Sequence, residues 1–478
     1  MTSMVISPAG TTPTAQGATI AQTLAEFAAG LRPQDIPAPV LERAKYLILD
    51  AVGIACASTH YDFAHRALAA VTELSAGAGD MPVIGLPQRL LPRDAMLMNG
   101  ILVHGLDYDD THAAGVIHAT ASCLPCALGV GARIGASGLD ALAAYIVGVE
   151  AGARLGAVAK GGFHQIGFHP TGLVGAFACA LIAGRLYGTT AAQMAMAQGI
   201  ALSVGAGSLE FLQDGAWTKR MHPGWAAVAG STAASFARHG FVGPREAYEG
   251  RFGLFASHLG QYASNVDLSL ATAGLGSTWE VSRVTVKPIP ACHFTHACAD
   301  AAAILREKHG LKPADIKSVR ALVPAEVVKT VCEPVATKRK PQNSYDAQFS
   351  IPYIVATALA RGSFGLQHLE ESALADPAVL ALANRVEYAV DPDSPFPRSY
   401  SGEVIVTTVD GRELRHREEV NRGAAERPIS NGDVESKFMD NATLAVSRTR
   451  AAEIRDLVLA MDRMADIAEL AEGLAARG

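Results

Sequence analysis

Apolar segments with helical spacing follow one another through the first half of the chain, and they constrain its fold more than any other feature. One of them, Val40–Ser58, places Leu41, Ala44, Leu47 and Ile48 on one face. Hardly any stretch before residue 280 alternates with the period of two that strands show. The sequence therefore predicts a large helical array, with helices at 19–30, 40–58, 63–76, from residue 92, and at 119–135, 139–158, 171–186, 191–206 and 225–239.

The pattern changes near residue 280. Val281–Val286 alternates and is rich in β-branched residues, which predicts a strand. Further strands are predicted at 316–322 and 386–390, with a hairpin at 403–416 on an Asp-Gly turn and helices at 294–309 and 348–360. Helical patterns return from Val434. We therefore predict a mainly α fold: a large all-helical domain built from both chain ends (19–280 and 426–478), with a smaller inserted α+β lid domain (281–425). The Thr-, Pro- and Gly-rich residues 1–18 are predicted to be disordered.

Composition excludes several classes of function. The net charge of −6 provides no basic field for nucleic acid. The longest apolar run, Thr171–Gly184, is too short to span a bilayer, and no secretory signal is recognised, so no membrane partner is expected. The seven cysteines are scattered, and Cys123 and Cys126 lie in an apolar segment typical of a buried helix rather than of a redox or zinc site. A reduced, cytoplasmic setting is the simplest interpretation.

The densest polar chemistry lies between His104 and His118. Asp107, Asp109 and Asp110 share this stretch with Thr111 and His112, and its flanks are apolar enough to be buried helices. Burying such groups is costly unless they are paired or used. Three interpretations stay open: a solvated loop in which Asp110 or Thr111 caps a helix, a metal site, and an acid-base site.

Three more polar groups precede apolar helices or follow strands. His169 stands just before a Pro-Thr-Gly helix start, where free N–H groups favour an anion or where it simply caps the helix. Lys219 and His222 precede the helix predicted from residue 225; the alternative there is a solvated basic turn. Lys287 follows the predicted strand in a Pro-stiffened segment that either directs the lysine or forms an interdomain hinge.

Six short motifs in this order resemble the MmgE/PrpD family. They are Asp-Tyr-Asp-Asp-Thr at 107–111, Phe-His-Pro-Thr-Gly at 168–172, Thr-Lys-x-x-His-x-Gly-Trp-Ala-Ala at 218–227, Lys-Pro-x-Pro-x-Cys at 287–292, Phe-Ser-Ile-Pro-Tyr at 349–353 and Phe-x-x-Asn-Ala at 438–442. Each is modest alone, but six in register are specific. The resemblance covers about residues 19–470. It implies a helical domain with an α+β lid, a homodimer, and no metal or other cofactor.

The resemblance also implies a site. Carried over residue by residue, the catalytic groups are Asp107, Thr111, His118, His169, Lys219 and Lys287, and His112 and His222 are added as substrate-binding candidates. The spacing from Thr111 to His118 differs by one residue from some members, so His112 could take the place of His118. The region around Ile289 and His293 varies in the family, which leaves the substrate pocket open.

The expected chemistry is proton transfer next to a carboxylate of a small di- or tricarboxylic acid. In this expectation the two lysines and His169 bind carboxylates and stabilise carbanion charge, while His118 moves the proton. The predicted reaction is dehydration of a 2-methylcitrate-like hydroxy acid; the alternatives are decarboxylation of the cis-aconitate type and epimerisation of the iminodisuccinate type. Two alternatives belong to other classes of protein: a non-catalytic carboxylate-binding protein, and a metallohydrolase that uses Asp107, Asp110 and His112.

Overall fold

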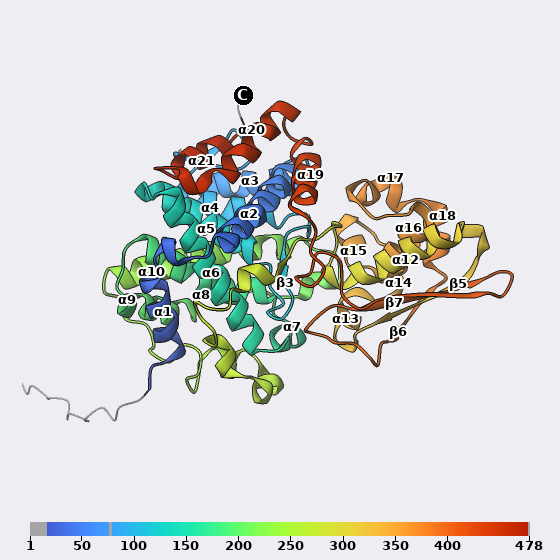
Figure 1. The fold of residues 1–478 in the computed structure, drawn as a ribbon, viewed down its shortest axis with the longest axis horizontal. Helices are drawn as coiled ribbons and strands as arrows, with labels where there is room; N and C mark the ends of the chain where they lie inside the picture. Colours follow the sequence, from blue (N-terminus) through green and yellow to red (C-terminus); the bar gives the residue numbers. More distant parts are fainter. Residues whose placement is uncertain (1–16, 76–78, 477–478) are drawn as a thin grey trace, which may run out of the picture.

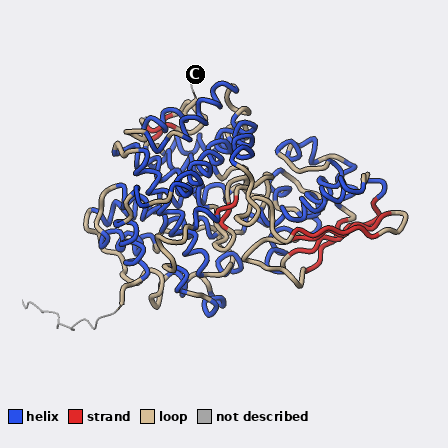
Figure 2. Tube along the Cα trace, in the orientation of Figure 1, coloured by secondary structure: helices blue, strands red, loops and turns tan. Residues whose placement is uncertain are grey.

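A computed structural model describes residues 17–75 and 79–476 in two lobes (Figure 1). Almost all of the segment predicted to be disordered lies outside these residues. The large lobe is helical, and the smaller lobe carries the only long strands of the described chain (Figure 2). The mainly α prediction is therefore confirmed.

The large lobe joins the described residues up to 286 to the C-terminal helices. A Cβ on Gly53 would lie 2.9 Å from the ring of Phe438, so glycine allows the late helix α19 to pack closely on α2. One hydrophobic core runs through both parts. The helices of this lobe are α1 (Ile20–Gly30), α2 (Ala38–Ser58), α3 (Asp62–Leu74), α4 (Pro92–Val103), α5 (Ala119–Ile134), α6 (Gly138–Val158), α7 (Gly162–Ile166), α8 (Pro170–Leu186), α9 (Ala191–Ala201), α10 (Thr218–Arg238), α11 (Leu254–Ser257), α19 (Asn431–Ala442), α20 (Arg448–Leu459) and α21 (Ala468–Leu474).

The smaller lobe has its own hydrophobic core around a four-stranded sheet. The strand order is β6-β5-β7-β8; β5 and β6 are parallel, and the other two pairs are antiparallel. Helices α12 and α16 pack on the sheet. The elements are β5 (Ile316–Val323), β6 (Val386–Val390), β7 (Gly402–Thr408), β8 (Glu413–Glu418), α12 (His296–His309), α13 (Val328–Val331), α14 (Val335–Arg339), α15 (Ser344–Gln348), α16 (Ile351–Arg361), α17 (Glu371–Leu374) and α18 (Pro377–Ala383).

Two short ribbons complete the fold. Strands β1 (Met81–Pro82) and β2 (Arg89–Leu90) pair near the C-terminal helices. Strands β3 (Thr111–His112) and β4 (Val284–Thr285) pair antiparallel, Thr111 opposite Thr285. This second ribbon matters for the site, because it brings the acidic stretch next to the segment that carries Lys287.

Several predicted boundaries were wrong. The strand expected at 281–286 is a 3₁₀ turn (Glu280–Arg283) followed by the two residues of β4, since Val281 and Val284 are buried three residues apart. Helix α9 ends at Ala201 rather than 206. The helix expected at 348–360 is α16, which begins at Ile351, because Ser350 caps it by accepting the N–H of Tyr353.

Helix α6 is long and apolar enough to cross a membrane by length and composition alone. In its apolar window, however, 94% of the residues are buried inside the protein. It packs on α8 and α5, as a core helix does.

Candidate active site

Asp107 lies between two lysines from distant parts of the chain. Lys219 donates a hydrogen bond to Asp107 Oδ2 at 2.8 Å, and Lys287 donates to Oδ1 at 2.5 Å and to the backbone oxygen at 2.8 Å. All three residues are buried. Burial alone would raise the pKa of Asp107, but the two ammonium groups outweigh it and hold the pKa well below its usual range. The pair of lysines is therefore fixed in place by an ionised carboxylate.

Close helix packing explains why Lys219 reaches Asp107. Helix α4 leads into the acidic stretch, and it crosses α10 at Gly100 and Gly224, where a Cβ on Gly224 would lie 2.2 Å from the backbone oxygen of Leu97. Helix α10 begins at Thr218, not at the predicted residue 225, and continues through Pro223. Packing against α4 overrides the Pro-Gly break, so Lys219 stands in the first helical turn and not in a turn before it.

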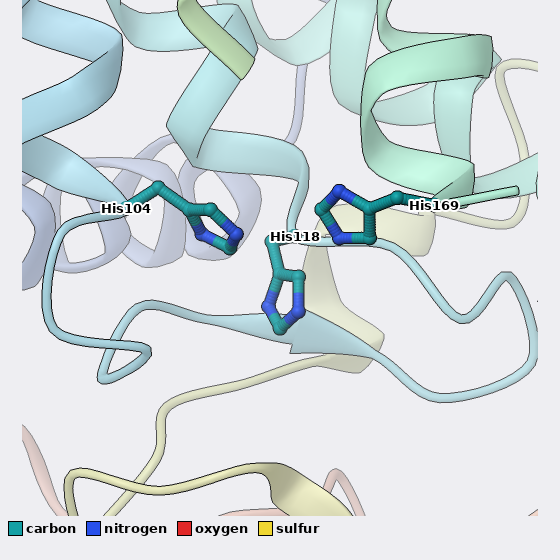
Figure 3. Close-up of side chains that lie close together, drawn as sticks. All are labelled: His104, His118 and His169. Atoms are coloured by element: carbon teal, nitrogen blue, oxygen red, sulfur yellow. The ribbon is translucent and has the colours of Figure 1, made fainter. Parts of the chain in front are cut away.

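Three imidazoles lie close together (Figure 3), and one of them, His118, lies near the carboxylate of Asp107. His104 follows the last turn of α4, His118 precedes α5, and His169 precedes α8. The ring centroid of His104 lies 4.8 Å from that of His118 and 5.4 Å from that of His169. Because the three rings come from the ends of three packed helices, the helical core holds them rigidly.

His118 is positioned to exchange a proton. Its Nδ1 lies 2.7 Å from the backbone oxygen of Asp110, which can only accept, so Nδ1 carries the hydrogen and the neutral ring keeps its lone pair on Nε2. Thr111 Oγ1 lies 3.3 Å from the same nitrogen. Burial lowers the pKa of His118 well below its usual range, and the ammonium group of Lys287 lowers it further. His118 is therefore neutral in the structure.

Two members of the acidic stretch form a buried pair that sequence reasoning did not place in the site. His104 Nδ1 lies 2.7 Å from Asp109 Oδ2, and neither side chain is exposed. Burial lowers the pKa of His104, whereas contacts with His104 and His118 bring that of Asp109 below its usual range despite burial. Their five-residue spacing across a loop was the available signal, but it fixes no contact without the turn at Asp107, whose φ is +47°.

The solvated-loop interpretation is wrong, because Asp110 and Thr111 are buried and the N-cap of α5 is His118. The carboxylate of Asp110 accepts hydrogen bonds from the backbone N–H and the hydroxyl of Thr120, in the first turn of α5. Burial raises its pKa to about 7. Asp110 therefore contacts the first turn of α5, which begins at Ala119, and does not line the cavity described below.

The two substrate-binding candidates lie differently. His222 Nδ1 is 3.1 Å from His169 Nδ1, so His222 contacts the cluster of His104, His118 and His169 through His169. His112 is not brought to this group: its Nε2 is 2.9 Å from Glu280, and its Nδ1 accepts from the N–H of Gly115. Side chains alternate along β3, so Thr111 and His112 face opposite sides. His112 therefore does not take the place of His118 in the site, although the spacing of the sequence allowed it.

A cavity of about 40 Å³ lies over these groups, and residues of both lobes line it. Its polar end holds Thr111, His118, His169 and Lys219 from the large lobe. Its other walls are mostly apolar, and the smaller lobe supplies several of them. They comprise Val116, Leu209, Phe211, Leu212, Cys292, Phe294, Phe349 and Tyr400, together with the polar side chains of His164, His293 and Thr330. Sequence reasoning missed these walls because nothing distinguishes such side chains from core residues.

The number of imidazoles matches that of a three-histidine metal site. Their ligand atoms lie within 4.8 Å of one another, and so do those of Asp107, Asp109 and His118. Both oxygens of Asp107, however, already accept from ammonium groups. Lys219 also lowers the pKa of all three imidazoles, and the same positive field repels a metal cation.

We therefore expect activity to survive removal of metal. Dialysis against EDTA should leave the turnover rate unchanged, because the ammonium groups of lysines, and not a metal ion, neutralise the charge of the substrate. The measurement is turnover before and after dialysis, with metal content checked by mass spectrometry. Loss of turnover that zinc or manganese restores would contradict this.

The fold and site define a class: a two-lobed, mainly helical enzyme with buried lysines, a carboxylate and imidazoles between its lobes. The MmgE/PrpD N-terminal domain matches residues 22–266 and the MmgE/PrpD C-terminal domain matches residues 289–463. The chain belongs to this family, as the six motifs predicted.

Curated relatives cover nearly the whole chain. A cis-aconitate decarboxylase of Aspergillus terreus is 28% identical over 467 residues, 94% of each chain. The cis-aconitate decarboxylase of Homo sapiens is 28% identical over 466 residues, 94% of this chain and 93% of the relative. A cis-aconitate decarboxylase-like protein, oryM of Aspergillus oryzae, is 27% identical over 468 residues, 94% and 95%. At the level of the family, this protein is a lyase.

Proposed function

We propose that this lyase decarboxylates a small unsaturated polycarboxylate of the cis-aconitate kind. The observation that carries the proposal is a cavity whose lining combines Lys219, Thr111 and several imidazoles with aromatic side chains. The names of the curated relatives support the same reaction.

The cationic end suits a carboxylate that must accept negative charge. Lys219 lines the cavity, and Lys287 lies behind it on the same carboxylate, Asp107; because both are held there, their positive field needs no rearrangement when charge develops on a substrate oxygen. Thr111 lines the same end and can donate to a substrate oxygen. These groups would stabilise the carbanion, delocalised into a retained carboxylate, that forms when a neighbouring carbon–carbon bond breaks.

The aromatic side chains of the lining suit the carboxylate that leaves. A carboxylate next to Phe211, Phe294 and Phe349 loses its hydration, whereas neutral CO₂ does not need any. The bond electrons pass into the conjugated system, CO₂ departs, and a proton is added to carbon. His118 supplies that proton: a bound polyanion raises the imidazole pKa, so the ring takes up a proton on Nε2 and then delivers it.

Dehydration of a 2-methylcitrate-like hydroxy acid is the second candidate, and one observation favours it. The neutral His118 with its lone pair on Nε2 is already the form that a general base requires. His169, backed by His222, would then have to protonate the leaving hydroxyl.

A substrate panel separates the candidates. The enzyme would be incubated with cis-aconitate, 2-methylcitrate and iminodisuccinate, and proton NMR with CO₂ capture would follow each. Decarboxylation gives one CO₂ per turnover and a product with one carboxylate fewer. Water loss without CO₂ would move the assignment to the dehydratase. If no panel member changes and none is bound, both proposals fail.

We also propose a homodimer that uses the outer face of α10. Trp217, Met221, Trp225 and Phe236 are 44–50% exposed on this helix, next to an apolar groove that includes Leu74. A contiguous apolar face of this kind can pack on its own copy across a two-fold axis.

Replacing Trp225 by Glu is expected to produce monomers, because a charge would be buried in that interface. Light scattering after size-exclusion chromatography measures the mass. Val390→Glu provides the control, since this residue is 52% exposed in the smaller lobe. A wild-type protein that runs as a monomer would contradict the proposal.

A further inference from the structure

A second cavity, of about 550 Å³, lies outside the candidate active site and is strongly basic. It is formed by the end of α6, the segment 270–283 and the loop 397–398 of the smaller lobe. Arg154, Lys160, Arg283 and Arg398 line it, against the single carboxylate of Glu280. In a chain with a net charge of −6, such a concentration of positive charge is unusual.

The cations here are largely uncommitted. Lys160 and Arg398 are exposed and form no ion pair within residues 17–75 and 79–476. Arg283 is 59% exposed and has only a 3.5 Å contact to Glu280. At the floor, Arg154 is already engaged: its terminal nitrogens donate to backbone oxygens of the 273–278 segment and pair with Glu150 and Glu280, although its buried Nε has no partner among the described groups. A ligand with several negative charges would satisfy like-charged groups that otherwise repel one another.

This cavity is connected to the active site through the β3–β4 ribbon. His112 lines the basic cavity and Thr111 lines the active-site cavity, on opposite faces of β3. Glu280 binds His112 on one side and Arg154 on the other. Strand β4 continues to Lys287 two residues later. A shift of Arg283 towards a bound anion would weaken its contact with Glu280 and would therefore act on the strands that position Thr111 and Lys287.

We propose that the basic cavity binds a small multivalent anion that is not the reacting substrate, and that its occupancy changes turnover. Phosphates and polycarboxylates share the required chemistry. Because Arg398 belongs to the smaller lobe and Lys160 to the large one, the anion bridges the lobes and stabilises their closed arrangement.

The test uses the full-length protein and two probes, pyrophosphate and propane-1,2,3-tricarboxylate. Isothermal titration calorimetry is performed on the Lys219→Met variant, which weakens carboxylate binding at the active site. One saturable site is expected for at least one probe, and it identifies the source as phosphate or carboxylate. Adding Lys160→Gln and Arg398→Gln should weaken that binding at least tenfold, whereas Arg320→Gln, an exposed arginine on β5, should not change it.

Turnover gives the second readout. The bound probe should change kcat of the wild-type enzyme at saturating substrate, and the Lys160→Gln/Arg398→Gln variant should lose this response while it keeps its activity without the probe. Absence of saturable binding, equal weakening by Arg320→Gln (an adventitious ion only), or binding without any change in kcat would overturn the proposal. These outcomes do not depend on which substrate the active site takes.

Discussion

Lys287→Met is expected to lower kcat/KM by roughly 100- to 1,000-fold, the effect of removing one fixed donor from a developing negative charge. Methionine keeps the length and apolar stem of the side chain, so the change removes mainly the charge. Asp107 then loses the partner of its Oδ1 and of its backbone oxygen, and only Lys219 still holds it. Breaking one partner of a buried ion pair also costs roughly 3–5 kcal/mol of folding stability.

The kinetic and folding effects can be separated with a matched control. Lys338 is also buried and lies in the smaller lobe, but unlike Lys287 it forms no ion pair with Asp107. Lys338→Met should leave kcat/KM within a few-fold of wild type. Steady-state kinetics at a temperature where all variants are folded, verified by circular dichroism, measures both. An unchanged kcat/KM for Lys287→Met would assign this lysine a purely structural role.

Acid is expected to unfold the protein at unusually mild pH, because many imidazoles are buried in the neutral form. Burial lowers the pKa of His222 and His164 to about 4 and that of His293 to about 3, and it also lowers the pKa values of His104, His118, His169 and His296. In the unfolded chain these groups titrate near 6.5. Below that pH the unfolded state binds more protons than the folded state, so stability is full above about 6.5 and falls as the pH drops.

Three buried carboxyls act in the opposite direction. Burial raises the pKa of Asp110 and Glu150 to about 7 and also raises that of Asp50, so these groups bind protons more readily in the folded state. The seven imidazoles outnumber them. Each histidine that is not offset removes about 1.4 kcal/mol per pH unit. Since a typical domain has only about 5–15 kcal/mol of stability, unfolding by about pH 5 is expected.

Denaturant unfolding between pH 7.5 and 5 measures this effect. His222→Asn should flatten the slope by about 1.4 kcal/mol per pH unit, because one such imidazole is removed. His309→Asn is the control, since this histidine is exposed at the end of α12. A free energy of unfolding that is constant over this range would contradict the neutral, buried state of the imidazoles.

The helical array was predictable because its signals are local. Helices α2, α5, α6 and α8 follow apolar periodicity and turn residues, and the structure confirms them. Where tertiary packing overrides local preference, prediction failed: α10 runs through Pro223 because Gly224 packs on α4, and Val281–Val286 is mostly a 3₁₀ turn.

Only part of the site could be predicted from the sequence. The density of Asp and His at 104–118 indicated a functional site. The prediction that Asp107 shares this site with Lys219 and Lys287 came from the family resemblance, since the two lysines are 112 and 180 positions from Asp107 in the sequence. The choice between His112 and His118 required the alternation along β3. The His104–Asp109 pair depends on the left-handed turn at Asp107, which sequence alone does not predict.

Deuterium incorporation tests the central claim, that His118 transfers a proton to or from the carbon next to a carboxylate that the two lysines hold. The enzyme would turn over its substrate in D₂O, and proton NMR would locate deuterium in the product and in recovered substrate. We predict one deuterium at that carbon with the wild-type enzyme, and a rate at least 100-fold lower with His118→Gln, in line with the loss of a general acid-base group. Turnover without deuterium at that carbon, or an undiminished rate of incorporation in His118→Gln, would contradict the account.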